Sequence, residues 1–244
     1  MPKNKKFAIE DKAYKDKRQL ISEKYGKREL WSVIDHWPLY CGIANLGQYL
    51  AMHTIFCSVM NVPGHIAEFG SWRGASLMFW AKLLRIYDPH CNKMIHCFDS
   101  FEGLVRFDKQ DGDAAALYDG QYKGSLEELQ DMIVLYTMED DVVIHKGFVE
   151  ETLAPTLQQN QELSFSFVYC DVDLYEPTKV ILELMHPRLS KGGVLVLDEW
   201  NYENFPGETI AVREFLDTYG HLYEQEHVKN SRQPSLVLRK KAIK

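Results

Sequence analysis

FSFVYCDVDLY, residues 165–175, is the stretch around which this chain is organised. Its first six residues are mostly apolar or aromatic, and two carboxylates, Asp171 and Asp173, follow them one residue apart. A second apolar run, Val194–Leu197, ends in the acidic pair at 198–199, and the segment between the two runs is long enough for one helix. The pattern therefore predicts a strand–helix–strand unit whose two parallel strands end side by side.

The four carboxylates at the ends of these two expected strands need a compensating positive charge. Without one they would repel one another and raise one another's pKa. A hard divalent metal ion is the simplest cation to place there, because such ions prefer carboxylate oxygens. A metal would lower the pKa of a bound hydroxyl, and a nearby carboxylate could take its proton. Carboxylates at strand ends are also common on protein surfaces, so that alternative stays open.

From residue 65 onward, short apolar segments alternate with amphipathic ones. The expected strands are His65–Phe69, Lys93–Phe98, Asp141–His145, Phe167–Val172, Val194–Leu197, Leu222–Val228 and Ser235–Arg239. The expected helices are Gly74–Tyr87, Ser125–Met138, Glu176–Leu189 and Gly207–Tyr219, with a polar excursion over 103–124. This alternation predicts a mostly parallel sheet with helices on both faces and an antiparallel strand at the edge. Ligands of such folds bind beyond the carboxyl ends of the strands.

Composition excludes several classes of protein. The net charge of −7 over 244 residues argues against nucleic acid as the main partner. No apolar run reaches the length of a membrane span, so we expect no membrane partner. The five cysteines form no CxxC pair, which fits reduced thiols and a cytoplasmic location. The sequence also lacks histidines at zinc spacing, a GxSxG motif and a P-loop.

The N-terminal part of the chain differs from the rest. Residues 1–30 carry ten Lys or Arg against five Asp or Glu, which favours a solvated basic arm over a docking site for an anionic partner. Residues 39–60 are expected to be helical, with four apolar residues on one face: Leu39, Ile43, Leu46 and Leu50. We therefore expect residues 1–60 to form a helical extension, serving as a lid, a dimer contact or cover for the core.

Two further strand ends carry candidate binding residues. The first expected strand runs into a turn between Glu68 and Gly74 that contains Gly70. It does not match GxGxxG, and an acidic residue before the glycine disfavours phosphate and suits an ammonium group. Asp99 ends the second strand, where a carboxylate commonly accepts hydrogen bonds from ribose hydroxyls. A plain strand-to-helix turn and a loop or N-cap aspartate are the alternatives.

Six motifs, in order from Val62 to Phe215, resemble those of a known family. They are VPGHIAEFGSWRGAS, FDSFEGL, HKGFVEETL, DVDLYEPT, LSKGGVLVLDEW and PGETIAVREF. They are similar to the successive motifs of the macrocin O-methyltransferase family, class I S-adenosylmethionine (SAM) methyltransferases that modify sugar hydroxyls, often on antibiotics. The resemblance implies a Rossmann-like α/β fold with a seven-stranded sheet, and a methyltransferase domain over residues 61–244.

The resemblance also implies roles for individual residues. It assigns SAM binding to Glu68, Gly70, Ser71, Gly74, Asp99, Ser100, Gly147 and Asp171. It assigns Mg²⁺, or another hard divalent cation, to Asp171, Asp198 and Glu199. Asp173 corresponds to the proposed general base. The family pattern is not matched everywhere: Val172 replaces a glycine, Glu199 an aspartate and Trp200 a tyrosine. Glutamate remains a competent oxygen ligand, but the arrangement of ligands must shift.

The implied reaction is methyl transfer from SAM to a hydroxyl of a small-molecule glycosylated acceptor. Asp173 would remove the hydroxyl proton, and positioning the two reactants would supply much of the rate. The excursion over 103–124, with Arg106, Tyr118 and Tyr122, and the loop Asn201–Phe205 are expected to form the acceptor pocket. Family habit suggests a homo-oligomer, a dimer or larger.

Two other functions remain compatible with the residues. A DxD motif at a strand end, here Asp171 and Asp173, is also used by metal-dependent glycosyltransferases to hold a nucleotide-sugar diphosphate. Glu68 before the glycine turn and the second acidic pair argue against that function. A non-catalytic SAM-binding protein is the other alternative.

Overall fold

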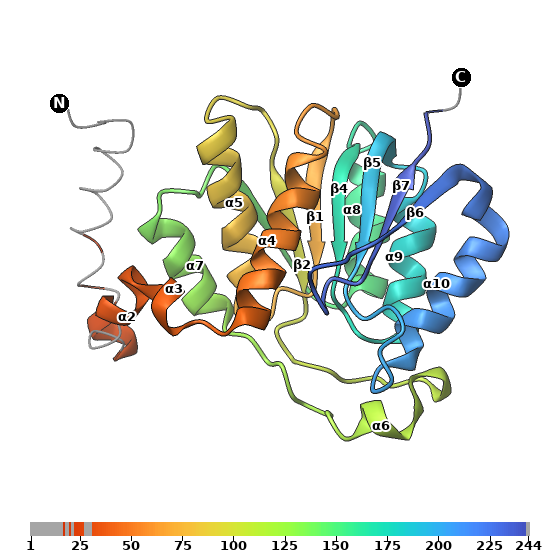
Figure 1. The fold of residues 1–244 in the computed structure, drawn as a ribbon, viewed down its shortest axis with the longest axis horizontal. Helices are drawn as coiled ribbons and strands as arrows, with labels where there is room; N and C mark the ends of the chain where they lie inside the picture. The colour runs from red at the N-terminus through yellow and green to blue at the C-terminus, as the bar shows by residue number, and fades with distance from the viewer. Residues whose placement is uncertain (1–16, 18–19, 21, 27–30, 243–244) are drawn as a thin grey trace.

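The computed structural model describes residues 17, 20, 22–26 and 31–242. Its centre is a seven-stranded sheet with strand order β3-β2-β1-β4-β5-β7-β6 (Figure 1). The strands are β1 His65–Phe69, β2 Ile95–Asp99, β3 Val142–Lys146, β4 Phe165–Cys170, β5 Leu189–Leu197, β6 Tyr223–His227 and β7 Leu236–Lys240. The first five are parallel, and β7 pairs antiparallel with both β5 and β6. The predicted fold is confirmed, with the antiparallel strand lying next to the edge strand β6.

The strand–helix–strand unit predicted from residues 165–175 forms as expected. Strands β4 and β5 are parallel neighbours, and their last residues, Cys170 and Leu197, are partners in the register. All six residues of β4 are buried, as expected for a central strand covered on both faces. Asp171 and Asp198 follow these partners directly, so the two acidic segments leave the sheet at the same place.

Helices cover both faces of the sheet (Figure 1). They are α4 Ile43–Cys57, α5 Ala75–Tyr87, α7 Leu126–Leu135, α8 Val149–Gln159, α9 Tyr175–Met185 and α10 Pro206–Tyr219. One core cluster joins α4, α5 and α7 to residues such as Phe167 and Tyr169 of β4. A second cluster joins α8, α9 and α10 to the alternate residues Val168 and Cys170. The period-2 alternation along β4 thus divides the core into two layers.

Helix α8 was not predicted. Its sequence, VEETLAPTLQQ, contains Pro155, which has no backbone N–H to donate inside a helix. The helix forms nevertheless, and its buried residues Val149, Leu153 and Leu157 recur every four positions on one face. This packing against the sheet outweighs the missing hydrogen bond. Two of its early residues, Glu150 and Glu151, lie in the first turn, where acidic side chains stabilise a helix.

The N-terminal helices differ from the single helix expected over 39–60. The chain forms α2 Trp31–Asp35, α3 Trp37–Tyr40 and α4, with an extended N-cap at Gly42 between the last two. The expected apolar face is exposed, with Leu39 at 78 % and Ile43 at 93 % exposure. A different set of α4 residues packs into the core: Ala51, Met52 and Phe56.

Most of the basic arm predicted over 1–30 lies outside the described residues. In its described part, Lys24 pairs with two carboxylates of α7, Glu127 at 2.8 Å and Asp131 at 2.6 Å. Among the described residues, no helix has the length and apolar character needed to cross a membrane.

The excursion over 103–124 crosses the carboxyl end of the sheet and contains a short helix, α6 Gly112–Ala116 (Figure 1). It is anchored by Asp111, which is 1 % exposed. One carboxylate oxygen of Asp111 accepts a hydrogen bond from the backbone N of Tyr175 (2.6 Å), and the other from that of Asp108 (2.7 Å). The polar excursion is thereby tied to the start of α9, which places its aromatic residues over the acidic strand ends.

Candidate active site

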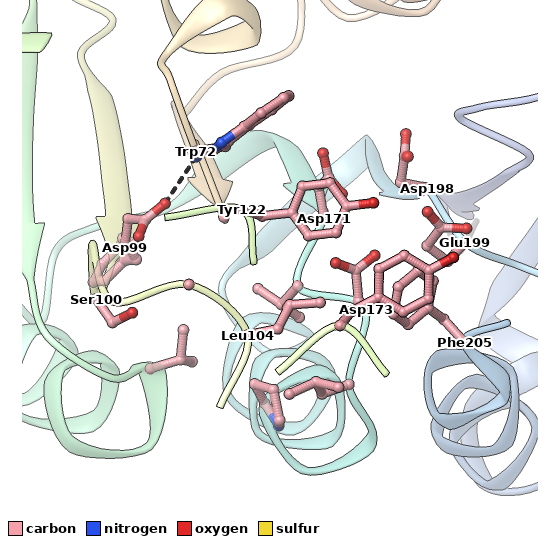
Figure 2. A pocket seen from close by; sticks show the side chains of 18 of the residues that line it. Trp72, Asp99, Ser100, Leu104, Tyr122, Asp171, Asp173, Asp198, Glu199 and Phe205 are labelled. Atoms are coloured by element: carbon pink, nitrogen blue, oxygen red, sulfur yellow. Dashed lines mark hydrogen bonds between the residues drawn. The ribbon is translucent and has the colours of Figure 1, made fainter. Parts of the chain in front are cut away.

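A pocket of about 350 Å³ opens at the carboxyl ends of β1, β2, β4 and β5 (Figure 2). Its position is the one predicted for a ligand of a parallel α/β sheet. Among the residues expected to bind ligands, these line the pocket: Gly70, Asp99, Ser100, Gly147, Asp171, Asp173, Asp198 and Glu199. Glu68, Ser71 and Gly74 are not part of the lining. The roles assigned to all eleven stay predictions.

Four carboxylates converge at the β4 and β5 side of this pocket (Figure 2). Asp171 and Asp173 follow β4, and Asp198 and Glu199 follow β5. Little of them reaches solvent, with exposures of 8 % for Asp173, 4 % for Asp198 and 5 % for Glu199. Asp173 has a positive φ of 62°, which turns the chain out of the strand direction. The side chains of Asp171 and Asp173 therefore need not share a face as they would in a continuing strand.

Burial raises the pKa of every member of this group, and repulsion between the carboxylates adds to the effect at Asp171, Asp173 and Glu199. Burial raises the pKa of Asp171 well above its usual range, and the neighbouring carboxylates, Asp198 first, add to the effect. Burial and the charge of Asp198 raise the pKa of Asp173 to about 7. Burial raises the pKa of Asp198 to about 6, and burial with the charges of Asp173 and Asp198 raises that of Glu199 to about 9. The positive charge of Arg232 lowers the pKa of Asp198 and Glu199 but does not offset the effect of burial, as expected where several carboxylates share one Arg side chain.

Side chains from β4, α10 and the β6–β7 loop hold the acidic turn that follows β5. The hydroxyl of Tyr169 donates a hydrogen bond of 2.5 Å to Oδ1 of Asp198. The carboxylate of Glu208, at the start of α10, accepts one from the backbone N of Glu199 at 2.9 Å. The amide of Gln233 donates to Oε1 of Glu199. The second oxygen of Glu199, Oε2, is buried and has no hydrogen-bond partner in the described part of the chain.

The donor set fits a hard divalent cation. Carboxylate oxygens are the ligands that such cations prefer, and a buried oxygen without a partner is costly unless something binds it. Among the described residues that line the pocket, Arg232 is the only cationic side chain. The described residues contain no group of three or more side chains already gathered around one metal position. The assignment of Asp171, Asp198 and Glu199 as metal ligands therefore stays a prediction.

The glycine turn after β1 lies against the acidic segment after β4. Gly70 has a φ of +80°, and a Cβ placed there would lie 1.8 Å from the carbonyl oxygen of Asp171. Only glycine permits this approach of two backbones. The turn and the carboxylates thus form one continuous wall of the pocket.

Asp99 organises the same turn from β2. One of its oxygens accepts hydrogen bonds from the backbone N of Ser71 (2.7 Å), from the hydroxyl of Ser71 (3.2 Å) and from the backbone N of Trp72 (2.9 Å) (Figure 2). The other oxygen accepts from the backbone N of Phe101 at 2.6 Å. A carboxylate offers about four acceptor positions, so little capacity is left for a ribose hydroxyl unless the Ser71 hydroxyl is displaced.

Glu68 lies beneath the turn and not in the pocket lining. It is fully buried and faces α5, where the hydroxyl of Ser76 donates a hydrogen bond of 2.5 Å to Oε1. Its Oε2 has no partner among the described residues, and burial raises its pKa to about 8. Gly74 is the left-handed N-cap of α5. Both residues shape the strand-to-helix connection, and a cofactor contact of Glu68 stays a prediction.

Part of the pocket wall is aromatic. Tyr118 and Tyr122 come from the excursion, and Tyr202 and Phe205 from the loop after the acidic turn. The rings of Tyr118 and Phe205 lie 5.0 Å apart, and those of Tyr118 and Tyr122 stack at 6.1 Å. Both segments expected to form an acceptor pocket therefore reach the same cavity.

Arg106, which sequence analysis placed in the acceptor pocket, does not line it. Its guanidinium lies 3.4 Å from the ring centre of Phe148 and 2.7 Å from a carboxylate oxygen of Glu151. Phe148 itself lines the pocket, so Arg106 lies behind this ring and not in the lining.

Sequence analysis missed several residues of the site. Gln48 of α4 and the pair Arg232 and Gln233 of the β6–β7 loop line the pocket, and Tyr169 holds Asp198 from within β4. The loop residues belong to SRQP, a short polar stretch like any hairpin loop. Only the sheet order, which places β7 beside β5, brings this loop to the carboxylates.

The fold and the site together define a class I methyltransferase architecture, and similarity to known proteins identifies the family. The family model described as macrocin-O-methyltransferase (TylF) matches residues 6–228. The chain therefore belongs to the macrocin O-methyltransferase family. Among solved structures, the calicheamicin methyltransferase CalS11 matches with a TM-score of 0.76 and 26 % identity, covering 94 % of this chain and 91 % of the other. The O-methyltransferase NovP matches with a TM-score of 0.65 and 24 % identity, covering 81 % and 80 %.

Two curated relatives match over 167 residues each. The 8-demethyl-8-(2,3-dimethoxy-alpha-L-rhamnosyl)-tetracenomycin-C 4'-O-methyltransferase of Streptomyces olivaceus is 33 % identical, covering 65 % of this chain and 60 % of the relative. The mycinamicin III 3''-O-methyltransferase of Micromonospora griseorubida is 29 % identical, covering 65 % and 63 %. The matched region spans less than two thirds of each relative's length.

Proposed function

We propose that the chain is an S-adenosylmethionine-dependent, divalent-metal-dependent O-methyltransferase acting on a hydroxyl of a sugar or a sugar-containing natural product. The observation that carries this proposal is the convergence of four carboxylates, three of them buried, at the ends of β4 and β5 in one pocket beside the glycine turn. Membership of the macrocin O-methyltransferase family supports the reaction class. The family does not favour the alternative of a glycosyltransferase.

Each side of the pocket has its own part in the proposed reaction. SAM, when bound, supplies an electrophilic methyl group, and its site is the wall formed by Gly70, Asp99 and Ser100. A divalent cation held by Asp171, Asp198 and Glu199 would supply positive charge that makes an acceptor hydroxyl more acidic. Asp173, at the centre of the group, removes the proton of that hydroxyl at its carboxylate oxygen. A raised pKa suits a base that works near neutral pH.

The aromatic wall supports a sugar as the acceptor. Flat aromatic rings contact the apolar faces of a sugar ring while its hydroxyls point to polar groups on the other side. Here Tyr118 and Tyr122 line the same cavity as the four carboxylates. The tetracenomycin relative is named for a rhamnosyl-bearing acceptor, which agrees with this class of substrate.

We also propose that the protein is a cytoplasmic homo-oligomer. All five cysteines are free thiols, which fits a reducing compartment. The exposed side chains of Leu39, Ile43 and Leu50 form an apolar row on α3 and α4, where a second copy would bury them. Light scattering after size-exclusion chromatography measures the oligomeric state, and a monomer at micromolar concentration would contradict this part.

The central experiment separates cofactor binding from chemistry. Purified protein is titrated with SAM and with S-adenosylhomocysteine by calorimetry, and methyl transfer from labelled SAM is then measured on a panel of rhamnosides and other glycosides. EDTA should abolish transfer and leave cofactor binding intact, with recovery on adding Mg²⁺. Loss of SAM binding on chelation would instead show that the cation belongs to the cofactor site.

A pair of matched variants tests the base. Asp173→Asn should lower kcat by about 10²–10⁴-fold, the usual effect of removing a general base, and leave binding of S-adenosylhomocysteine unchanged. Asp113→Asn alters an exposed aspartate of α6 and serves as the control. Undiminished turnover in Asp173→Asn would reject the role of Asp173. Stabilisation by a nucleotide sugar with Mn²⁺, and by neither SAM nor S-adenosylhomocysteine, would favour a glycosyltransferase.

A further inference from the structure

The first turn of α10 holds the acidic turn after β5 by two side chains. Oε1 of Glu208 accepts the hydrogen bond from the backbone N of Glu199 at 2.9 Å. The hydroxyl oxygen of Thr209, the next residue, accepts one from the backbone N of Asn201 at 2.8 Å. Glu208 has no exposed surface. A fully buried carboxylic side chain in a helix is rare and calls for a specific partner.

The backbone of Glu199 needs this acceptor because it has left the sheet. The backbone N of Asp198 still donates to the carbonyl of Cys170 in β4 at 3.1 Å. Glu199 is one residue further, and its N–H is directed to Glu208 instead of a strand. Buried backbone donors require a partner, so Glu208 completes the hydrogen bonding where the strand ladder stops.

Glu208 is itself held in place by tight packing at the start of α10. A Cβ on the preceding residue, Gly207, would lie 2.0 Å from Oδ1 of Asp111 and 2.7 Å from the backbone N of Tyr175. The same Asp111 oxygen accepts the hydrogen bond from Tyr175. The helix start is thus packed against the buried anchor of the excursion, and Glu208 has a fixed base from which to hold its partner.

We propose that Glu208 is a positioning residue that sets the place of Glu199 in the carboxylate cluster through the hydrogen bond to its backbone N–H. Glu208 does not line the pocket, so it acts through Glu199 and not on a ligand directly. Glu199 is also the residue at which this chain departs from the aspartate expected for its family, so its longer side chain depends more on a fixed backbone. The effect on cation binding rests on the proposed function, whereas the effect on the backbone does not.

Two substitutions at one position test the proposal. Glu208→Gln keeps an oxygen that accepts the Glu199 hydrogen bond, and Glu208→Ala removes it. Asp217→Ala, an exposed carboxylate of the same helix, is the matched control. Hydrogen exchange of the peptide containing residues 198–202 is followed by mass spectrometry, and Mn²⁺ affinity is measured by electron paramagnetic resonance.

We expect Glu208→Ala to speed exchange of this peptide and to weaken Mn²⁺ binding about 10- to 100-fold, the usual effect of losing an outer contact of a metal ligand. The control, Asp217→Ala, should change neither measurement. Glu208→Gln should stay within about threefold of wild type in both measurements, because it restores the acceptor. Binding of S-adenosylhomocysteine should be unchanged in both variants and in the control.

Two results would overturn the positioning role. The first is wild-type exchange of the 198–202 peptide in Glu208→Ala. The second is a loss of Mn²⁺ affinity and of exchange protection in Glu208→Gln as large as in Glu208→Ala. The negative charge of Glu208, and not its hydrogen-bond acceptor, would then hold the turn. If Glu208→Ala does not fold, Glu208→Met, which fills the space but offers no oxygen acceptor, takes its place in both comparisons. Failure of the wild type to bind Mn²⁺ rejects the proposed cation site, and exchange at 198–202 still decides the role of Glu208.

Discussion

Tyr169 and Asp198 are joined across two parallel strands by a hydrogen bond of 2.5 Å from the phenol to Oδ1. Tyr169 is 1 % exposed and lies within β4, so its hydroxyl reaches Asp198 from inside the core. The bond lowers the pKa of Asp198 against the effect of burial, so this pKa, about 6, lies below those of Asp173, about 7, and Glu199, about 9. The tyrosine thus favours an ionised carboxylate at the end of β5.

Tyr169→Phe removes only this hydroxyl. We expect the free energy of unfolding at pH 7.5 to fall by about 1.5–3 kcal/mol, the usual worth of a hydrogen bond to a charged group. Tyr223→Phe is the matched control, because the Tyr223 hydroxyl bonds a histidine, His186, at 2.7 Å. Its loss should be about 0.5–1.5 kcal/mol. Urea unfolding of both variants makes the comparison, and an equal or smaller loss in Tyr169→Phe would contradict the ionised state of Asp198.

The aromatic wall gives a prediction about the acceptor. Tyr122→Ala should raise the KM for a glycoside acceptor about fivefold and leave the affinity for S-adenosylhomocysteine unchanged, since one stacked ring is worth about 1 kcal/mol. Leu117→Ala is the control: the residue belongs to the same excursion, is 78 % exposed and lies outside the pocket lining. Equal changes in KM for the two variants would show that the excursion as a whole, and not the ring, is responsible.

Much of the fold follows from residues that act locally. Buried apolar runs, the capping serine Ser125, whose hydroxyl oxygen accepts the backbone N–H of Glu128 at 3.1 Å, and the glycine turns are properties of short segments. These local features predicted the strands and most of the helices correctly. Helix α8 was not predicted because Pro155 is locally unfavourable in a helix, whereas the packing that stabilises this helix involves distant parts of the chain.

The same distinction, between features set by short segments and features set by distant contacts, applies to the candidate site. The acidic strand ends could be predicted, because parallel strands must end together. Gln233 and Glu208 could not, since their contacts with Glu199 depend on which strand lies beside β5 and on where α10 begins. The apolar row of α3 and α4 is exposed in the structure, although the helical spacing of its residues indicated a face that packs against something. Helical periodicity identifies an apolar face but not what covers it.

Substitutions at Gly70 and at Gly120 can be compared to separate the cost of backbone strain from the cost of a steric clash. Both have a positive φ, but a Cβ at Gly70 would strike the Asp171 carbonyl, whereas a Cβ at Gly120 meets nothing within 4 Å. Gly120→Ala should lower the free energy of unfolding by about 1–2 kcal/mol, from the left-handed backbone alone. Gly70→Ala should lower it by at least about 1–3 kcal/mol more, from overpacking. Similar losses of unfolding free energy in the two variants, measured with urea, would mean that the backbones at residues 70 and 171 can move apart without cost.

His96 and His145 form a buried pair on neighbouring strands. Nδ1 of His96 lies 3.1 Å from Nε2 of His145, and the rings stack at 5.4 Å. Burial lowers the pKa of His96 to about 4, and the neighbouring histidines, His145 and then His65, add to the effect. The folded protein therefore keeps His96 neutral at a pH at which the unfolded chain, with a pKa near 6.5, binds a proton.

Stability should therefore fall as pH falls from about 6.5 to about 4, because the unfolded state binds more protons in that window. The contribution of His96 is up to about 3 kcal/mol, from the size of the shift. Urea unfolding of wild type and His96→Gln at pH 7.0, 5.5 and 4.5 should show the wild type losing more stability on acidification. His90→Gln, at an exposed histidine, should follow the wild type at every pH. A His96→Gln curve parallel to wild type would show that His96 is protonated in the folded state, since it would then contribute nothing to the pH dependence.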